Sequence, residues 1–444
     1  MMQLPAGFEE MCGHLCDFPE LKQALNQPAV TSIRRHPLKP NSSQTALESV
    51  PWCPHGYYLQ ERPNFSHDPL LYAGAYYVQE ASSMLLWHVL EQLQLPKKNL
   101  RVLDLCAAPG GKSTLILDWL ENKGMLVTNE VVAKRTRILS ENMERWGYAN
   151  RIVTQSEPEA FARSGAFFDL VVVDAPCSGE GMFRKEPDAL AMWSESNVQH
   201  SHNRQCSILD SAARCVAPGG VLIYSTCTYN EKENEGSVKH LLETHQAQVI
   251  SMDVPEKWGV TVGGNPMTQG LRCFPHKVKG EGFFIAAVQF PGEKQAPREQ
   301  GKKRKNYPAL HPAIGPWLQN PGVIASLEHR GEHFIYPTAM HELVEELTKK
   351  IHVLSVGTKA GKLAGKELIP HHALALSLEL RNDSASYQLN ADEAAQYMAR
   401  ETLNNTGGLA GWCLMKHQGV ALGWGKATGG IVKNKWPLRV VIRK

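Results

Sequence analysis

Two cysteines and an aspartate stand directly after apolar runs, where a sheet enzyme would place reactive groups. Residues 170–173 (LVVV) precede Asp174 and a Pro-Cys177 step, and residues 221–224 (VLIY) precede Ser-Thr-Cys227. Such runs are typical of strands buried on both faces of a parallel sheet. Ligands of open α/β sheets bind outside the carboxyl ends of the strands. We therefore expect Asp174, Cys177 and Cys227 to face one crevice from two adjacent strands.

A neighbouring pair of thiols is compatible with several chemistries. Cys177 and Cys227 could form a redox disulfide, bind a metal, or be inert core residues, which is the commoner role of a lone cysteine. Neither motif supplies the other ligands of an obvious zinc site, so we expect no metal. Nucleophilic attack on an electron-poor ring fits better, with Asp174 nearby. The residues themselves do not say which thiol attacks.

A glycine-containing segment, Asp104-Leu-Cys-Ala-Ala-Pro-Gly-Gly-Lys112, joins the first expected strand of the sheet to a helix. Its glycines allow a ligand to approach the backbone, and the helix start offers free N–H groups. The spacing is neither GxGxxG nor that of a phosphate-binding loop. Glu130 ends the next strand, where a carboxylate can hold ribose hydroxyls. A nucleoside cofactor without a pyrophosphate fits, and we expect S-adenosyl-L-methionine.

Strand and helix patterns alternate from about residue 96 to residue 291, which indicates a parallel sheet with crossover helices. We expect an α/β fold with a doubly wound, Rossmann-like sheet of seven strands and an antiparallel final hairpin. The expected strands are 102–105, 125–129, 152–154, 169–173, 220–226, 247–252 and 283–290. The expected helices are 112–122, 132–146, 203–216 and 231–245. Asn230 and Glu233 have the spacing of a capping box for the last helix.

Composition and charge limit the class of protein. The chain has 444 residues, 43% of them hydrophobic and 20% charged, and a net charge of +3, as in an ordinary globular protein. No apolar run approaches the roughly 20 residues of a membrane helix, and the N-terminus lacks a signal-peptide pattern. Ten cysteines without close pairing favour reduced thiols. We expect a monomeric protein of the cytoplasm that does not enter a membrane.

The C-terminal stretch has charge of one sign. Residues 402–444 contain seven Lys or Arg and no Asp or Glu, interleaved with Trp412, Trp424 and Trp436. A few surface lysines usually mean only a solvated face. Basic groups combined with aromatic rings favour a nucleic-acid platform, because bases stack on rings while cations neutralise phosphates.

Several motifs together resemble one enzyme family. Residues 104–112 (DLCAAPGGK), 174–181 (DAPCSGEG) and 224–228 (YSTCT) are similar to those of the RNA cytosine-5 methyltransferases, as are 79–83 (QEASS) and 272–284. The match covers about residues 30–290. The GEGMFRK run after Ser178 and a C-terminal Gly-Trp-Gly-Lys426 resemble the bacterial branch that acts on small-subunit ribosomal RNA.

This resemblance implies roles that the residues alone leave open. It implies that Cys227 is the nucleophile, that Cys177 helps to release the product, and that Asp174 contacts the base. Cytosine C5 becomes nucleophilic once a thiolate adds at C6, and the base must leave its stack to be reached. The resemblance also implies a set of residues that contact S-adenosyl-L-methionine. They are Cys106, Ala107, Ala108, Pro109, Gly110, Gly111, Lys112, Glu130, Arg135 and Asp174.

The resemblance and the sequence patterns together suggest five segments. An N-terminal α+β extension is expected first, then the methyltransferase domain, a basic linker, a first C-terminal domain and a PUA-like RNA-binding domain. Their expected bounds are 1–95, 96–291, 292–307, 308–385 and 386–444. In the first segment we expect a helix from Tyr76 to about Leu93.

The expected activity is methylation of cytosine C5 in ribosomal RNA, with 16S rRNA or the small subunit as partner. One alternative is the same chemistry on transfer RNA. Another is a non-catalytic RNA-binding assembly factor. The presence of Asp174, Cys177 and Cys227 argues against the second alternative, because a protein that only binds RNA has no need of all three.

Overall fold

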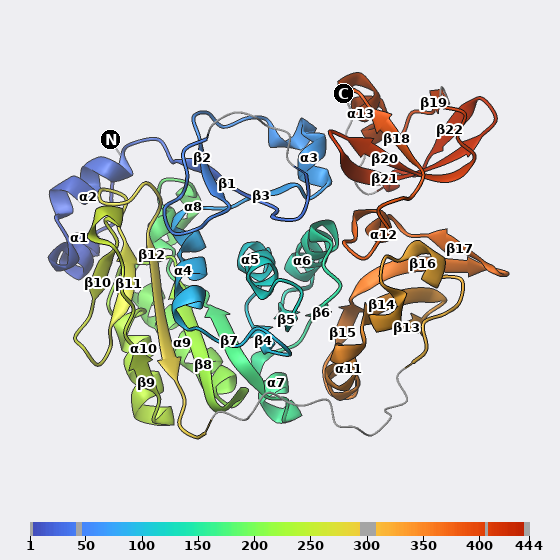
Figure 1. The fold of residues 1–444 in the computed structure, drawn as a ribbon. Coiled ribbons are helices and arrows are strands. Elements are labelled where there is room, and N and C mark those ends of the chain that lie inside the picture. Colours follow the sequence, from blue (N-terminus) through green and yellow to red (C-terminus); the bar gives the residue numbers. More distant parts are fainter. Residues whose placement is uncertain (1–2, 41–46, 294–307, 405–406, 439–444) are drawn as a thin grey trace.

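The computed structural model describes residues 3–40, 47–293, 308–404 and 407–438. Within these ranges the chain forms four sheets around which the helices pack (Figure 1). From residue 294 onward the expected linker 292–307 lies outside the described residues.

The central sheet runs in the order β10-β11-β12-β8-β7-β4-β5-β6-β15, and β9 also pairs with β12. Its middle strands, β8, β7, β4, β5 and β6, are parallel, which confirms the expected doubly wound α/β sheet. The described strands of this sheet are β4 (Arg101–Asp104), β5 (Met125–Asn129), β6 (Arg151–Thr154), β7 (Phe168–Asp174), β8 (Val216–Thr226), β9 (Gln248–Ile250), β10 (Thr261–Gly263), β11 (Gly270–Cys273), β12 (Phe283–Gln289) and β15 (Val353–Val356).

Helices cover both faces of this sheet, so alternate residues of each strand enter different cores. In β7, Leu170 and Val172 belong to the core on one face, whereas Val171 and Val173 belong to the other. This two-sided burial is why the strand sequences are continuous apolar runs. The first face carries α4 (Leu85–Gln92), α5 (Gly111–Leu120) and α6 (Ala133–Trp146), and the second carries α7 (Pro158–Ser164), α9 (Glu195–Ala213) and α10 (Glu235–His245).

The chain reverses its direction of travel across the sheet between β4 and β7. From β4 the crossovers lead to β5 and β6 on one side, while β7 leads to β8 on the other. The crossover helices therefore diverge beyond the carboxyl ends of β4 and β7. In open α/β sheets this switch point is where ligands bind.

The N-terminal region contains a sheet in the order β2-β1-β3. The helices α1 and α2 lie to the left of this sheet in Figure 1. The expected helix from Tyr76 is wrong at its start. Tyr76–Val78 forms β3, paired with β1, because two tyrosines and a valine suit a strand; the helix α4 begins at Leu85. The elements of this region are α1 (Phe8–Cys12), α2 (Phe18–Leu25), β1 (Thr31–Arg35), β2 (Gly56–Leu59) and α3 (Pro69–Tyr72).

The C-terminal region forms the two remaining sheets and also completes the central one. β15 lies in the expected first C-terminal domain, yet it pairs with β6 at the edge of the central sheet. The other elements are β13 (Ile324–His329), β14 (Glu332–Pro337), α11 (His341–Thr348), β16 (Thr358–Ala364), β17 (Glu367–Pro370), α12 (His372–Leu376), β18 (Ser386–Leu389), α13 (Ala391–Met398), β19 (Leu403–Asn404), β20 (Gly411–His417), β21 (Val420–Thr428) and β22 (Ile431–Asn434).

The two ends of the chain share a hydrophobic core. Ile33 and Tyr76 of the N-terminal sheet belong to the same buried cluster as Tyr397 and Trp436 of the C-terminal sheet. The N-terminal region therefore packs against both the central sheet and the last domain. No helix among the described residues is long and apolar enough to cross a membrane.

Candidate active site

A cleft of about 830 Å³ opens at the carboxyl ends of the central strands. It is lined by the loop after β4, the end of β5, the loops after β7 and β8, and the first turns of α9. The expected site residues that line it are Cys106, Ala108, Glu130, Arg135, Asp174, Cys177 and Cys227. The sheet therefore brings together side chains that are as much as 121 residues apart in the chain (227 − 106).

The two thiols are direct neighbours in this cleft. β7 and β8 are parallel with Asp174 opposite Ser225, so the loops that follow these strands leave the sheet side by side. The Sγ atoms of Cys177 and Cys227 are 3.3 Å apart. The backbone N–H of Gly181 donates to the carbonyl of Cys227 at 2.9 Å, which ties the first loop to the second.

The surroundings of the Cys177 thiol oppose its ionisation. The hydrogen bond to Cys227 and burial raise the pKa of Cys177 well above its ordinary value. A thiol with a raised pKa stays protonated at neutral pH and acts as a proton donor, because the thiolate is the nucleophilic form. The environment of Cys177 thus favours an S–H group that points at the sulfur of Cys227.

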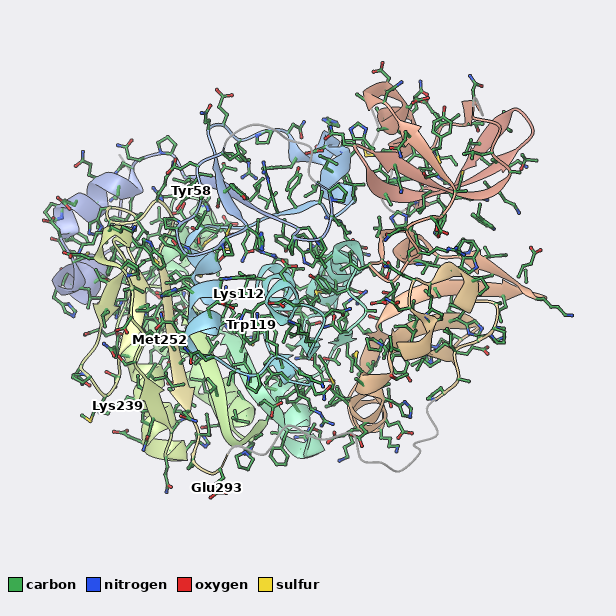
Figure 2. The ribbon with its side chains drawn as sticks, viewed as in Figure 1. Tyr58, Lys112, Trp119, Lys239, Met252 and Glu293 are labelled. Carbon is green, nitrogen blue, oxygen red and sulfur yellow. The ribbon has the colours of Figure 1, made fainter. Side chains whose placement is uncertain are left out.

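Asp174 is held by two partners. The Lys112 Nζ lies 2.8 Å from one carboxylate oxygen, and the Ser225 hydroxyl donates to the other at 2.7 Å. Burial is the largest single influence on the pKa of Lys112 and lowers it, but Asp174, Cys227 and Asp104 together raise it by more, so the net shift is upward. Figure 2 labels Lys112 near the middle of the molecule, at the start of α5. The pair places an oriented carboxylate at the edge of the cleft.

The second carboxylate of the cleft, Glu130, lies just after β5 and is 4% exposed. One of its oxygens accepts the N–H of Val132 at 2.9 Å, and the other is 3.2 Å from the Arg135 guanidinium. Arg135 also donates to the carbonyl of Ala108 at 2.8 Å. Arg135 therefore links the end of β5 to the loop after β4.

The loop after β4 approaches the cleft with its backbone. Gly110 has φ +112°, a conformation that side chains rarely adopt, and a Cβ there would lie 3.2 Å from Leu139. No side chain caps the start of α5 among the described residues, so its first N–H groups remain available. Ala107, Pro109, Gly110, Gly111 and Lys112 form the body of this loop without lining the cleft. A glycine turn, a free helix start and a buried carboxylate are groups that fit a nucleoside cofactor.

Two buried glutamates that the sequence analysis did not select hold the thiol loop. Glu233 accepts the N–H of Ser178 at 2.9 Å and also its hydroxyl, and Gln205 donates to it at 2.8 Å. Glu180, fully buried, accepts the N–H groups of Tyr229 and Asn230 at 2.7 and 3.0 Å. Both glutamates therefore fix the positions of the residues next to Cys177 and Cys227.

Asn230 and Glu233, whose spacing predicted a capping box, are part of this network instead. They do exchange hydrogen bonds, but α10 begins at Glu235 and no described side chain caps it. The carboxylate of Glu233 turns toward the loop after β7. Glu180 lies inside the 174–181 motif, so the sequence did draw attention to its surroundings. The spacing of the motif could not show that the Glu180 side chain points inward.

The expected aromatic platform near the C-terminus is wrong for two of its three tryptophans. Trp424 and Trp436 are each only 2% exposed and pack inside hydrophobic cores. Trp412 is half-buried, with the ammonium groups of Lys426 and Lys435 within 5.4 and 5.9 Å of its ring centre. Of the three tryptophans, Trp412 is the one that Lys426 and Lys435 contact among the described residues.

Comparisons with known proteins cover nearly the whole chain. Residues 4–81 match the family described as the N-terminal domain of 16S rRNA methyltransferase RsmF, and residues 91–289 match 16S rRNA methyltransferase RsmB/F. Residues 384–442 match the methyltransferase RsmF PUA domain. The chain is 31% identical to ribosomal RNA small subunit methyltransferase F of Salmonella paratyphi B, over 96% of this chain and 93% of that protein.

Solved structures are similar over somewhat less than two thirds of the chain. A methyltransferase homologue from Pyrococcus horikoshii is 26% identical with a TM-score of 0.52, over 61% of this chain and 90% of that one. The NSun6 structure from the same organism, solved with SFG, shares the fold at 20% identity and a TM-score of 0.54, over 64% of this chain and 97% of that one. S-adenosyl-L-methionine is the cofactor that these matches indicate. The chain therefore belongs to the RsmF-type methyltransferases of the RsmB/F family.

Proposed function

We propose that the protein transfers a methyl group to C5 of a cytosine in small-subunit ribosomal RNA through a covalent bond between Cys227 and C6. The observation that carries this proposal is the pair of thiols, 3.3 Å apart in the same cleft as Asp174. A methyltransferase acting on oxygen or an amine has no need of a nucleophilic thiol. A ring carbon does need one, because C5 of cytosine is a poor nucleophile until a thiolate has added at C6.

The cofactor end of the cleft is proposed to be formed by the loop after β4 and by Glu130. The loop's backbone and the start of α5 would hold S-adenosyl-L-methionine, with Glu130 accepting hydrogen bonds from its ribose hydroxyls. When bound, this cofactor supplies an electrophilic methyl group. Arg135 keeps the Glu130 carboxylate and the loop carbonyl of Ala108 in fixed positions.

The base end of the cleft supplies the nucleophile. The Cys227 thiolate forms a bond to C6, and the electron pair of the C5–C6 double bond becomes available at C5. The Asp174 carboxylate, held by Lys112 and Ser225, accepts a hydrogen bond from the amino edge of the base. The cytosine must leave its stack to reach these groups, so loops or opened helices are the expected RNA substrates.

Product release returns both cysteines to their starting state. After methylation a base takes the C5 proton, the C–H electron pair forms the C5–C6 double bond, and the C6–S bond breaks with its electron pair on the Cys227 sulfur. Cys177, protonated because its pKa is raised, donates a hydrogen bond to this departing thiolate. The free cysteines of the chain, ten in all, suit the reducing cytoplasm that we propose as its location.

The decisive experiment separates the roles of the two thiols. With RNA and cofactor present, Cys177→Ala should accumulate a protein–RNA species that survives denaturing electrophoresis and reduction, because a thioether holds it. Cys227→Ala should form no such species and transfer no methyl group. An adduct in Cys227→Ala would reverse the assignment, and its absence from both variants would refute the covalent mechanism.

The substrate is tested separately from the chemistry. Bisulfite mapping of RNA from a strain that lacks this gene should show the loss of methylation at one or more cytosines of 16S rRNA. Loss at transfer RNA positions alone would identify transfer RNA as the substrate. Unchanged methylation in both RNAs would refute the proposed activity.

A further inference from the structure

A cluster of metal-binding side chains lies outside the cleft, where α9 packs against α10. Asp210 is on α9, and His240 and His245 are on α10. The Nε2 atoms of the two histidines both lie 2.8 Å from the same Asp210 Oδ1. No other group of three such side chains converges in this way among the described residues. The reaction proposed for the cleft uses none of the three.

The spacing of the three ligand atoms suits a small cation. The carboxylate oxygen and the two imidazole nitrogens all lie within 4.8 Å of one another. In a tetrahedral zinc site, with bonds of about 2.0–2.2 Å, the ligand atoms are roughly 3.3 Å apart. Each imidazole nitrogen would move about 0.5 Å away from the carboxylate oxygen, and the two nitrogens, now within 4.8 Å of each other, would settle at the same spacing. The three side chains are partly exposed, which leaves room for these movements. The cation would take the place of the two imidazole N–H protons that face the same Asp210 oxygen.

The seam between the helices extends this donor set. His202, Cys206 and Asp210 are four residues apart on α9 and therefore share one face of the helix. The Cys206 Sγ lies 3.7 Å from the His202 Nε2, and His202 Nδ1 lies 3.2 Å from the Ser237 hydroxyl on α10. These groups are not among the three that converge, so the choice of metal rests on the two imidazoles, which favour zinc and its neighbours over magnesium or calcium.

We propose that Asp210, His240 and His245 bind one Zn²⁺ ion, which fastens α9 to α10. Three protein ligands leave a fourth position for water. None of the three proposed ligands lines the cleft, although Ser207 and Ile208, shortly before Asp210 on α9, do. In Figure 2, Lys239 of α10 lies near the outer edge of the molecule. Because α9 forms part of the cleft wall, the ion would stabilise a helix that the active site depends on.

Zinc chloride titrated into the full-length protein tests this site by calorimetry. A Cys177→Ser/Cys227→Ser background removes the thiol pair of the cleft, which could itself bind zinc. One equivalent should bind. His240→Ala and Asp210→Asn should each weaken this binding by more than the roughly 10–100-fold that follows loss of an outer-shell partner. His329→Ala, an exposed histidine on β13, should leave it unchanged.

Thermal unfolding in the same Cys177→Ser/Cys227→Ser background provides a second readout. Zinc should raise the melting temperature of this parent protein and of its His329→Ala variant, and should not raise that of its Asp210→Asn variant. Asp210→Asn retains a hydrogen-bonding side chain of the same size, so its melting temperature without zinc reports whether the fold is intact. Equal zinc affinity in the parent and both ligand variants, or no zinc-dependent stabilisation of the parent, would overturn the proposal.

Discussion

The two loops that face each other across the cleft differ in the groups that hold them. The loop of residues 104–112 is held mainly at its backbone: Leu105 and Ala107 donate to carbonyls of β7 and β5 at 2.9 and 2.8 Å, and Arg135 donates to the Ala108 carbonyl. The loop of residues 174–181 has backbone bonds as well, but it also depends on the buried carboxylates of Glu180 and Glu233. The positions of the thiols therefore depend more on buried carboxylates than the position of the 104–112 loop does.

This difference predicts that the two ends can be impaired separately. Backbone hydrogen bonds survive most substitutions, but a buried carboxylate that loses its charge leaves several donors without a good acceptor. Substitutions in the glutamate network should therefore slow the chemical step and leave cofactor affinity unchanged. Substitutions of Glu130, the proposed ribose contact, should weaken cofactor binding and leave the chemical step unchanged.

Among substitutions that keep both thiols, the largest effect on rate is expected from Glu233→Gln. An amide nitrogen in place of Oε1 would face two donors, the Ser178 N–H and Gln205, and in place of Oε2 it would face the Asn230 amide, so at least one donor loses its acceptor in either orientation. Methyl transfer in a single turnover should fall about 100-fold, equivalent to about 2.7 kcal/mol. Calorimetry should show unchanged affinity for S-adenosyl-L-methionine.

A residue nearby in the chain offers a matched control. Glu231→Gln changes the same side-chain type two positions earlier, but Glu231 is exposed and pairs with His14 at the surface. Its methyl-transfer rate should equal that of the wild type. If Glu233→Gln also transfers methyl groups at the wild-type rate, the carboxylate network does not position the thiols.

The next effect in size is expected from Glu130→Gln. A hydrogen bond to a charged acceptor contributes about 1.5–3 kcal/mol, so affinity for S-adenosyl-L-methionine should fall about 10- to 100-fold. At saturating cofactor the methyl-transfer rate should recover, because the thiol loop is untouched. Unchanged affinity in calorimetry would remove Glu130 from the cofactor site, and a rate that stays low at saturation would contradict the separation of the two ends.

The contrast between features set by the backbone and features set by side-chain direction also explains how much of this molecule the sequence could predict. The parallel strands were predictable because burial on both faces leaves continuous apolar runs, such as residues 170–173. Their topology then placed Asp174, Cys177 and Cys227 in one cleft. The contribution of β15 was not predictable, because its partner β6 is about 200 residues earlier and no local pattern records the pairing.

Side-chain direction was the other limit. Glu180 and Glu233 are polar residues in or near motifs, and nothing in their spacing distinguishes a buried acceptor from a solvated charge or a helix cap. For Trp424 and Trp436 the error was the opposite: their interleaving with lysines suggested a stacking face, but both rings are buried in hydrophobic cores. Lys426 is two residues after Trp424 on β21 and therefore on the same face of the strand, but it is exposed. Residue type and spacing did not show which of these side chains the core covers.

The smallest effect on catalysis is expected from those lysines. Lys426, Lys433 and Lys435 are exposed on adjacent strands or just beyond them, around the Trp412 ring. Replacing all three by Gln should weaken RNA binding and lower the slope of log affinity against log salt by about 2, because each phosphate of single-stranded RNA that a cation neutralises adds roughly 0.7 to this slope. Lys239→Gln, an exposed lysine on α10, should leave the slope unchanged. Because the cleft is untouched, cofactor affinity and the single-turnover rate at saturating RNA should remain those of the wild type. An unchanged salt slope in the triple variant would show that RNA reaches the cleft without using this face.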